Sequence, residues 1–223
     1  MNDFLRSVSP ADPRDVVGRF PVWDAAAVGA AVRRARAAVP AWRDAGFKAR
    51  ATVIRRFRDL AGVRREELAE LIAREVGKAI WEARGEADLL PARADVILKE
   101  GMRFIQPMRA AANAWASFHP RGVLAVLGPF NSPAHLPSDH IIPALATGNT
   151  IVLKPSEMAP AVGDFLARIW RDAGLPLGVL ELVQGRAETG HQLALHPGVD
   201  GILFAGSYSV GRSLQEELLD QPG

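Results

Sequence analysis

With 223 residues, of which 48% are hydrophobic and 23% charged, the chain has the length and composition of a globular protein that buries a sizeable core. A net charge of +2 is too small to predict a nucleic-acid or membrane partner, and neither a signal peptide nor an apolar run of about 18 residues is present, so we expect a cytoplasmic protein. Cysteine is absent, which excludes disulfides, thiolate metal sites and a cysteine nucleophile within these residues.

The first half of the chain, residues 1–114, has apolar residues at helical spacing. The first predicted helix is marked by Val28, Val32, Ala35, Val39 and Trp42. Asp24 stands before it as an N-cap. A second helix carries the apolar residues from Val53 to Ile72 and is interrupted near Gly62, and a third begins near Lys78 and runs to Ile105. We therefore expect a layer of helices in this half.

The second half, residues 115–223, alternates short apolar strands with helices. The predicted strands are "GVLAVLG" (122–128), "TIVLKP" (150–155), "VLELVQG" (179–185) and "GILFAGS" (201–207). The predicted helices are 136–147, 160–173, 187–196 and one that begins after Ser207. Short β-branched runs separated by helices are typical of parallel βαβ units with right-handed crossovers. The sequence thus predicts an α/β fold with an open, doubly wound, Rossmann-like parallel sheet, which binds ligands at the carboxyl ends of its strands.

Polar residues follow the first two of these strands. Asn131 stands between Pro129 and Pro133, in a loop that the prolines make rigid and non-helical. Its side chain either stabilises the turn, as asparagine commonly does, or presents its amide group as a hydrogen-bond donor to a ligand. Lys154 and Glu157 follow the second strand, where they form either a surface ion pair or a pair that binds the hydroxyls of a ribose.

The fourth strand ends in a glycine-serine turn that opens a helix, from Gly206-Ser207 to Gly211. Free backbone N–H groups and the positive end of a helix dipole favour a phosphate there, although a serine in this position is also an ordinary N-cap. No G-x-G-x-x-G follows any strand, so the usual dinucleotide fingerprint is absent. His135 and His140 lie about 140° apart around a helix, which does not let them share one metal ion, so we predict no metal site.

In combination and in this order, these segments resemble the NAD(P)-dependent aldehyde dehydrogenase superfamily over essentially the whole chain. The matching stretches are "GPFNSP", "IIPALATGNTIVLKPSEMAP", "AGLPLGVLELVQG" and "GILFAGSYSVGR". The stretches "GPFNSPAHLPSDHIIPAL" and "LVQGRAETGHQLALHPGVDGILFAGS" look most like its succinylglutamate-semialdehyde branch. The resemblance implies NAD as cofactor, a small-molecule aldehyde as substrate and a homo-oligomer for the complete enzyme.

The resemblance also assigns roles to residues. Asn131 would donate its amide to the aldehyde oxygen as negative charge develops, as half of an oxyanion hole. The implied cofactor-binding residues are Lys154, Ser156, Glu157, Gly185, Gly206, Ser207, Val210 and Gly211. Among them, Lys154 and Glu157 would bind the adenosine ribose, Ser207 a phosphate, and Val210 one side of the adenine. Ser132 departs from the family pattern, which has an aromatic residue there.

The family's nucleophile, a cysteine thiolate, and its glutamate base are not among the matching residues. The resemblance places both beyond Gly223, in a second, catalytic domain. The sequence is therefore expected to be one NAD-binding domain, residues 1–223, that stops before the catalytic domain and does not oxidise an aldehyde alone. The alternative is a non-catalytic nucleotide-binding or scaffold protein that kept the fold and lost the chemistry.

Overall fold

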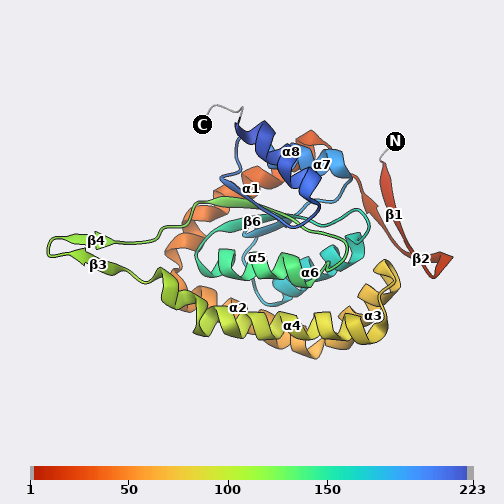
Figure 1. Cartoon of the computed structure of the whole chain (residues 1–223), viewed down its shortest axis with the longest axis horizontal. Helices are drawn as coiled ribbons and strands as arrows, with labels where there is room; N and C mark the ends of the chain where they lie inside the picture. The colour runs from red at the N-terminus through yellow and green to blue at the C-terminus, as the bar shows by residue number, and fades with distance from the viewer. Residues whose placement is uncertain (1–2, 220–223) are drawn as a thin grey trace.

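The structure is a computed structural model that describes residues 3–219, and at its centre lies a parallel sheet of four strands (Figure 1). These strands are β5 (Val123–Leu127), β6 (Thr150–Lys154), β7 (Leu180–Leu182) and β8 (Gly201–Phe204). Their order across the sheet is β7-β6-β5-β8, and all three pairings are parallel. The order reverses between β5 and β8, which is the place where such sheets bind ligands. The predicted α/β, doubly wound sheet is confirmed.

Helices cover both faces of this sheet. The helices that follow its strands are α5 (His135–Ala146), α6 (Pro160–Asp172), α7 (Ala187–Ala194) and α8 (Tyr208–Leu219). Val123, Ala125 and Leu127 of β5 face a core shared with α7 and α8, while Leu124 and Val126 face a second core shared with α5 and α6. Because successive side chains of a strand point to opposite faces, one apolar run supplies both cores.

The N-terminal helices lie on both sides of the sheet. Their bounds are α1 (Ala25–Asp44), α2 (Gly46–Val63), α3 (Arg65–Val76) and α4 (Ile80–Lys99). Helix α1 packs on the face of α7, whereas α2, α3 and α4 lie outside α5 and α6 on the other face (Figure 1). The Asp24 carboxylate accepts a hydrogen bond from the Ala27 N–H at 2.9 Å, which confirms the predicted N-cap of α1.

The predicted interruption of the second helix near Gly62 is confirmed, because the backbone of Arg64 leaves the helical conformation and divides this helix into α2 and α3. Two other details of the first half differ from the sequence prediction. The predicted third helix ends at Lys99 and is followed by a 3-10 turn, η1 (Gly101–Ile105), so the extension to Ile105 was wrong. Two antiparallel hairpins, β1 (Phe4–Ser9) with β2 (Asp12–Pro21) and β3 (Met108–Ala111) with β4 (Ala114–Ala116), stand where only helices were expected.

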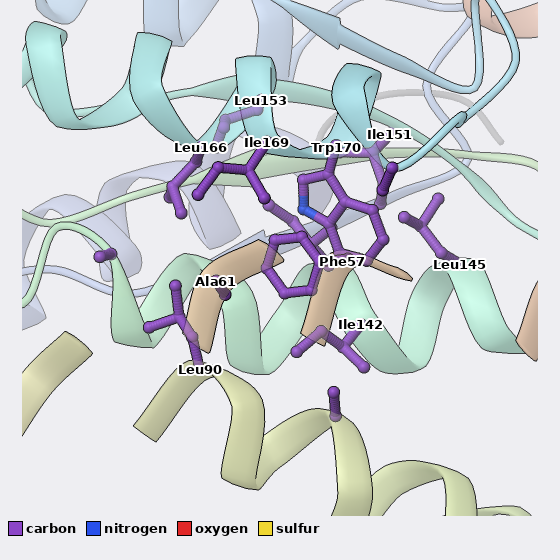
Figure 2. Close-up of a cluster of buried hydrophobic side chains, with 14 of the residues drawn as sticks. Phe57, Ala61, Leu90, Ile142, Leu145, Ile151, Leu153, Leu166, Ile169 and Trp170 are labelled. Carbon is purple, nitrogen blue, oxygen red and sulfur yellow. The ribbon is translucent and has the colours of Figure 1, made fainter. Parts of the chain in front are cut away.

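The core between the sheet and α2 is built around two aromatic rings. Phe57 of α2 stacks on Trp170 of α6 with ring centroids 3.8 Å apart and planes 5° from parallel (Figure 2). Both side chains are fully buried, and Leu145, Ile151 and other aliphatic side chains surround them. This contact fixes α6, and with it the loop that precedes α6, against the helical layer. Over residues 3–219, no helix combines the length and apolarity that crossing a membrane would require.

Candidate functional site

A groove lies at the carboxyl ends of the strands, where the strand order reverses between β5 and β8. It consists of two adjoining cavities of about 380 Å³ and about 600 Å³. The two cavities share Gly128, Ser156, Phe204 and Val210 as lining residues. Gly128 and Ser156 come from the loops after β5 and β6, and the other two from β8 and α8. The groove is therefore built where the fold places ligand sites.

Lys154 and Glu157 line the smaller cavity, as predicted for a pair at the end of β6. Lys154 is buried, and its Nζ lies 3.4 Å from a carboxylate oxygen of Glu157. Burial lowers the pKa of the Lys154 ammonium, and the charge of Glu157 partly offsets that effect. Gly190 of α7 faces the stem of Lys154, and a methyl group on Gly190 would lie 3.6 Å from Lys154 Cδ. An ammonium and a carboxylate in a partly buried cavity can together donate and accept hydrogen bonds with ligand hydroxyls.

Asn131 lines the larger cavity together with Gly206 and Ser207. The structure thus brings the loop after β5 and the turn after β8 together across the reversal of strand order. Ser207 Oγ lies 3.4 Å from the Val210 N–H in the first turn of α8, which is a long distance for a capping hydrogen bond. A hydroxyl and the unpaired N–H groups of a helix start suit an anionic group such as phosphate.

Three of the predicted cofactor-binding residues are glycines, and a side chain at each position would contact a neighbouring residue. A methyl group on Gly206 would lie 2.4 Å from the ring of Phe204, so a side chain there would require this ring to move. A methyl group on Gly211 would lie 3.1 Å from the same ring, and Gly211 lines a separate cavity beside α8. Gly185 is buried, and a methyl group on it would lie 2.0 Å from Thr189 Oγ1. The lining residues of the two cavities do not include Gly185 and Gly211, so their assignment to the cofactor stays a prediction.

Along the groove, the lining residues change from apolar to charged to hydrogen-bonding, which matches the order of adenine, ribose and phosphate in an adenine dinucleotide. Apolar side chains of β5 and α8, Leu127, Val210 and Leu214, line the smaller cavity and suit an adenine ring. The Lys154 and Glu157 pair lies in the same cavity and suits a ribose, and the start of α8 next to it suits a phosphate. Asn131 at the larger cavity would then face the reactive end of such a ligand.

The comparison with known proteins identifies the family of the chain. A family model described as the aldehyde dehydrogenase family matches residues 2–221, nearly the whole chain. The chain belongs to the aldehyde dehydrogenase family. Members of this family use NAD or NADP and bind aldehydes. No group of three or more histidine, aspartate or glutamate side chains that could hold a metal ion is present among residues 3–219.

Curated relatives in this family share close to half of the residues. The N-succinylglutamate 5-semialdehyde dehydrogenase of Chromobacterium violaceum is 44% identical over 98% of this chain, and that of Paraburkholderia xenovorans is 46% identical over 87% of it. The match covers 45% and 41% of these two relatives, so the chain spans less than half of their length.

Solved structures of the family superimpose closely on this chain. An NADP-dependent enzyme of E. coli is 33% identical with a TM-score of 0.92, over 97% of this chain and 46% of that enzyme. An NAD-dependent benzaldehyde dehydrogenase of Corynebacterium glutamicum is 28% identical, also with a TM-score of 0.92, over 99% of this chain and 49% of that enzyme. The aldehyde dehydrogenase fold therefore extends over nearly the whole chain.

Sequence reasoning missed one side of this family member's groove, which α7 and α8 contribute. The missed lining residues are Ala187, Gly190, His191, Ser213, Leu214 and Glu217. His191 of α7 and Glu217 of α8 form an ion pair at 2.6 Å beside the cavity. Helical spacing offered a signal, because Val210, Ser213, Leu214 and Glu217 follow one another at intervals that place them on one face of α8.

Proposed function

We propose that residues 1–223 are the NAD-binding part of an aldehyde dehydrogenase that oxidises N-succinylglutamate 5-semialdehyde to N-succinylglutamate. The observation that carries this proposal is the groove, which has Lys154 and Glu157 in one cavity and Asn131 in the next. The identity of 44–46% with curated N-succinylglutamate 5-semialdehyde dehydrogenases supports the choice of substrate. We further propose residues 1–114 as the N-terminal layer, residues 115–223 as the dinucleotide-binding core, and a cytoplasmic homo-oligomer as the working form.

Each residue of the groove has a distinct task in this proposal. Lys154 and Glu157 bind the ribose hydroxyls, while Ser207 and the first N–H groups of α8 bind a phosphate. Asn131 donates its side-chain N–H to the aldehyde oxygen, and this hydrogen bond strengthens as negative charge develops on that oxygen. The rigid loop that carries Asn131 keeps the donor in place, so little reorganisation is needed during the reaction. Bound NAD would accept the hydride that the oxidation removes.

The remaining chemistry needs groups that residues 1–223 do not contain. Aldehyde oxidation in this family requires a thiolate nucleophile, and the chain has no cysteine. Serine is a poor substitute because its hydroxyl is much harder to deprotonate without an adjacent histidine and acid. The second candidate is a nucleotide-binding module without catalysis. The two candidates differ in whether the groove can support turnover when the missing groups are supplied.

A chimera supplies those groups and tests the proposal. Residues 1–223 replace the matching 45% of the Chromobacterium violaceum relative, and NADH formation is followed at 340 nm. We expect the chimera to oxidise N-succinylglutamate 5-semialdehyde with a kcat/KM within about tenfold of the parent enzyme and far above its value for acetaldehyde. Residues 1–223 alone should form NADH only at the rate of the buffer blank.

Two results would contradict these expectations. A folded chimera that forms no NADH would favour the non-catalytic module. A chimera with equal kcat/KM for acetaldehyde and the semialdehyde would remove the substrate assignment while leaving the family membership intact.

A second prediction concerns the choice between NAD and NADP. The Glu157 carboxylate beside the ribose repels a 2′-phosphate, and the neighbouring Lys154 ammonium moderates that repulsion. We expect residues 1–223 to bind NAD more tightly than NADP by about 1–3 kcal/mol, and Glu157→Gln to narrow the difference. Calorimetric titration with each cofactor gives the ratio of dissociation constants. Glu70→Gln, on the exposed side of α3, is the matched control and should leave the ratio unchanged. A ratio that Glu157→Gln does not alter would show that another residue selects the cofactor.

A further inference from the structure

The two loops that line the groove each lead directly into a helix that lacks a side-chain cap of its own. Helix α5 begins four residues after Asn131, with Ala134 at its N-cap, and α6 begins three residues after Glu157, with Ala159 at its N-cap. Neither alanine has a side chain that can accept a hydrogen bond from the first N–H groups of its helix. These N–H groups are buried and need acceptors from elsewhere in the molecule.

Glu75 of α3 supplies the acceptors for α6. Its side chain is buried, with 4% of its surface exposed. One carboxylate oxygen accepts the N–H of Ala161 at 2.9 Å, and the other accepts the N–H of Val162 at 2.8 Å. Ser7 of β1 donates its hydroxyl to the same carboxylate at 2.5 Å. Burial raises the pKa of Glu75, while these three hydrogen bonds oppose that rise because they favour the ionised form.

Glu86 of α4 does the same for α5. It is 5% exposed, and a single carboxylate oxygen accepts the N–H groups of Ala134 at 2.9 Å and His135 at 3.1 Å. The other oxygen forms an ion pair with Lys78. The helical layer thus contributes two buried glutamates, each of which caps the helix that follows one groove loop.

A buried carboxylate keeps such a contact firmly in place. Moving the helix start away from it would leave a charge and two N–H groups without partners in a region that excludes water. The favourable end of the helix dipole adds to the attraction. Because only two residues lie between Asn131 and Ala134, and only three between Glu157 and Ala161, a shift of either helix start would displace the groove residue on that loop.

We propose that Glu75 and Glu86 are positioning residues of the groove: Glu75 sets the place of the loop that carries Glu157, and Glu86 sets the place of the loop that carries Asn131. The assignment of these loops to cofactor and aldehyde rests on the proposed function. The two glutamates act on different loops, so their loss has different consequences for binding. If the two glutamates only stabilised the fold, the loss of either one would change NAD binding in the same way.

Hydrogen exchange and NAD titration of residues 1–223 test this separation. We expect Glu75→Ala to speed amide exchange in residues 155–163 about tenfold and to raise the dissociation constant of NAD about five- to tenfold, as the loss of one or two capping bonds predicts. Glu86→Ala should speed exchange in residues 129–137 by a similar factor and leave the dissociation constant of NAD within about twofold, because none of residues 129–137 lines the smaller cavity. Titrations are made well below each variant's melting temperature.

The glutamine variants test whether the exchange rate of each loop depends on the acceptor oxygens and not on overall stability. They also remain usable if an alanine variant does not fold. Glu86→Gln keeps one oxygen that can accept both N–H groups but loses the ion pair with Lys78, so exchange in residues 129–137 should return most of the way to the wild-type rate. Glu75 uses both oxygens, so Glu75→Gln should restore residues 155–163 only in part.

Equal changes of NAD affinity in the Glu75 and Glu86 variants, or exchange that rises evenly over the whole chain, would overturn the proposal. Wild-type protein that does not bind NAD would refute the proposed function. The exchange rates would still decide whether each glutamate fixes its own loop.

Discussion

Replacing Phe57 by alanine should lower the free energy of unfolding by about 3–5 kcal/mol, as expected for the loss of a fully buried aromatic side chain. Phe57 has no exposed surface, and it stacks on Trp170 at 3.8 Å between α2 and α6. The cavity cannot close easily, because α2 is also held by α4 and α5. Urea unfolding followed by circular dichroism gives the difference in free energy.

Phe104→Ala is the matched control for that measurement. Phe104 is 82% exposed, so the same chemical change should cost no more than about 0.5 kcal/mol. If the Phe57 variant were no less stable than the Phe104 variant, the core between α2 and α6 would not hold the groove loop as described.

Replacing Asn131 by alanine in the chimera with the Chromobacterium violaceum relative should lower kcat for aldehyde oxidation by about 10²–10³-fold, the usual effect of removing one oxyanion donor. The KM for NAD should change little, since Asn131 lines the larger cavity and not the one that holds Lys154 and Glu157. Stopped-flow measurement of NADH formation separates the chemical step from product release. Asn113→Ala, in the turn of the β3–β4 hairpin, should leave both constants unchanged. An unchanged kcat for Asn131→Ala would remove this residue from the catalytic site.

The second half of the chain could be predicted from its sequence because its signals are local. Short buried strands have an unbroken apolar run, as in "TIVLKP", and glycine and proline mark their ends. The rule that parallel strands present their carboxyl ends at one edge then brought Asn131, Lys154 and Ser207 together. The structure places all three at the groove.

The two hairpins could not be predicted in the same way. In β2 the residues "DPRDVVGRFP" contain charges and a glycine, and their partial burial depends on β1 and on helices elsewhere in the chain. The short strands β3 and β4 are exposed throughout, so no alternation of apolar and polar residues marks them. The pairing of β1 with β2 and of β3 with β4 therefore depends on contacts between strands, which the spacing of apolar residues along the sequence does not indicate.

Glu75 and Glu86 were also invisible to sequence reasoning, although they cap two helices beside the groove. A local cap lies within a few residues of the helix start, and the sequence offers alanine at both positions. The acceptors come from 86 and 48 residues away. Separation along the chain also explains the missed groove residues of α7 and α8, which lie far from the predicted pair Lys154 and Glu157 in the sequence but line the same cavity.

The most direct test of the whole account is the titration of NAD into residues 1–223, with Lys154→Met as the comparison. Methionine keeps most of the length and apolar stem of Lys154 but removes its donors, so the fold should survive while ribose binding is lost. We predict saturable binding of one NAD per chain by the wild-type protein, and an at least about tenfold weaker affinity in the variant. Wild-type protein that shows no saturable binding, or equal affinities of the two proteins, would contradict the assignment of this groove to NAD.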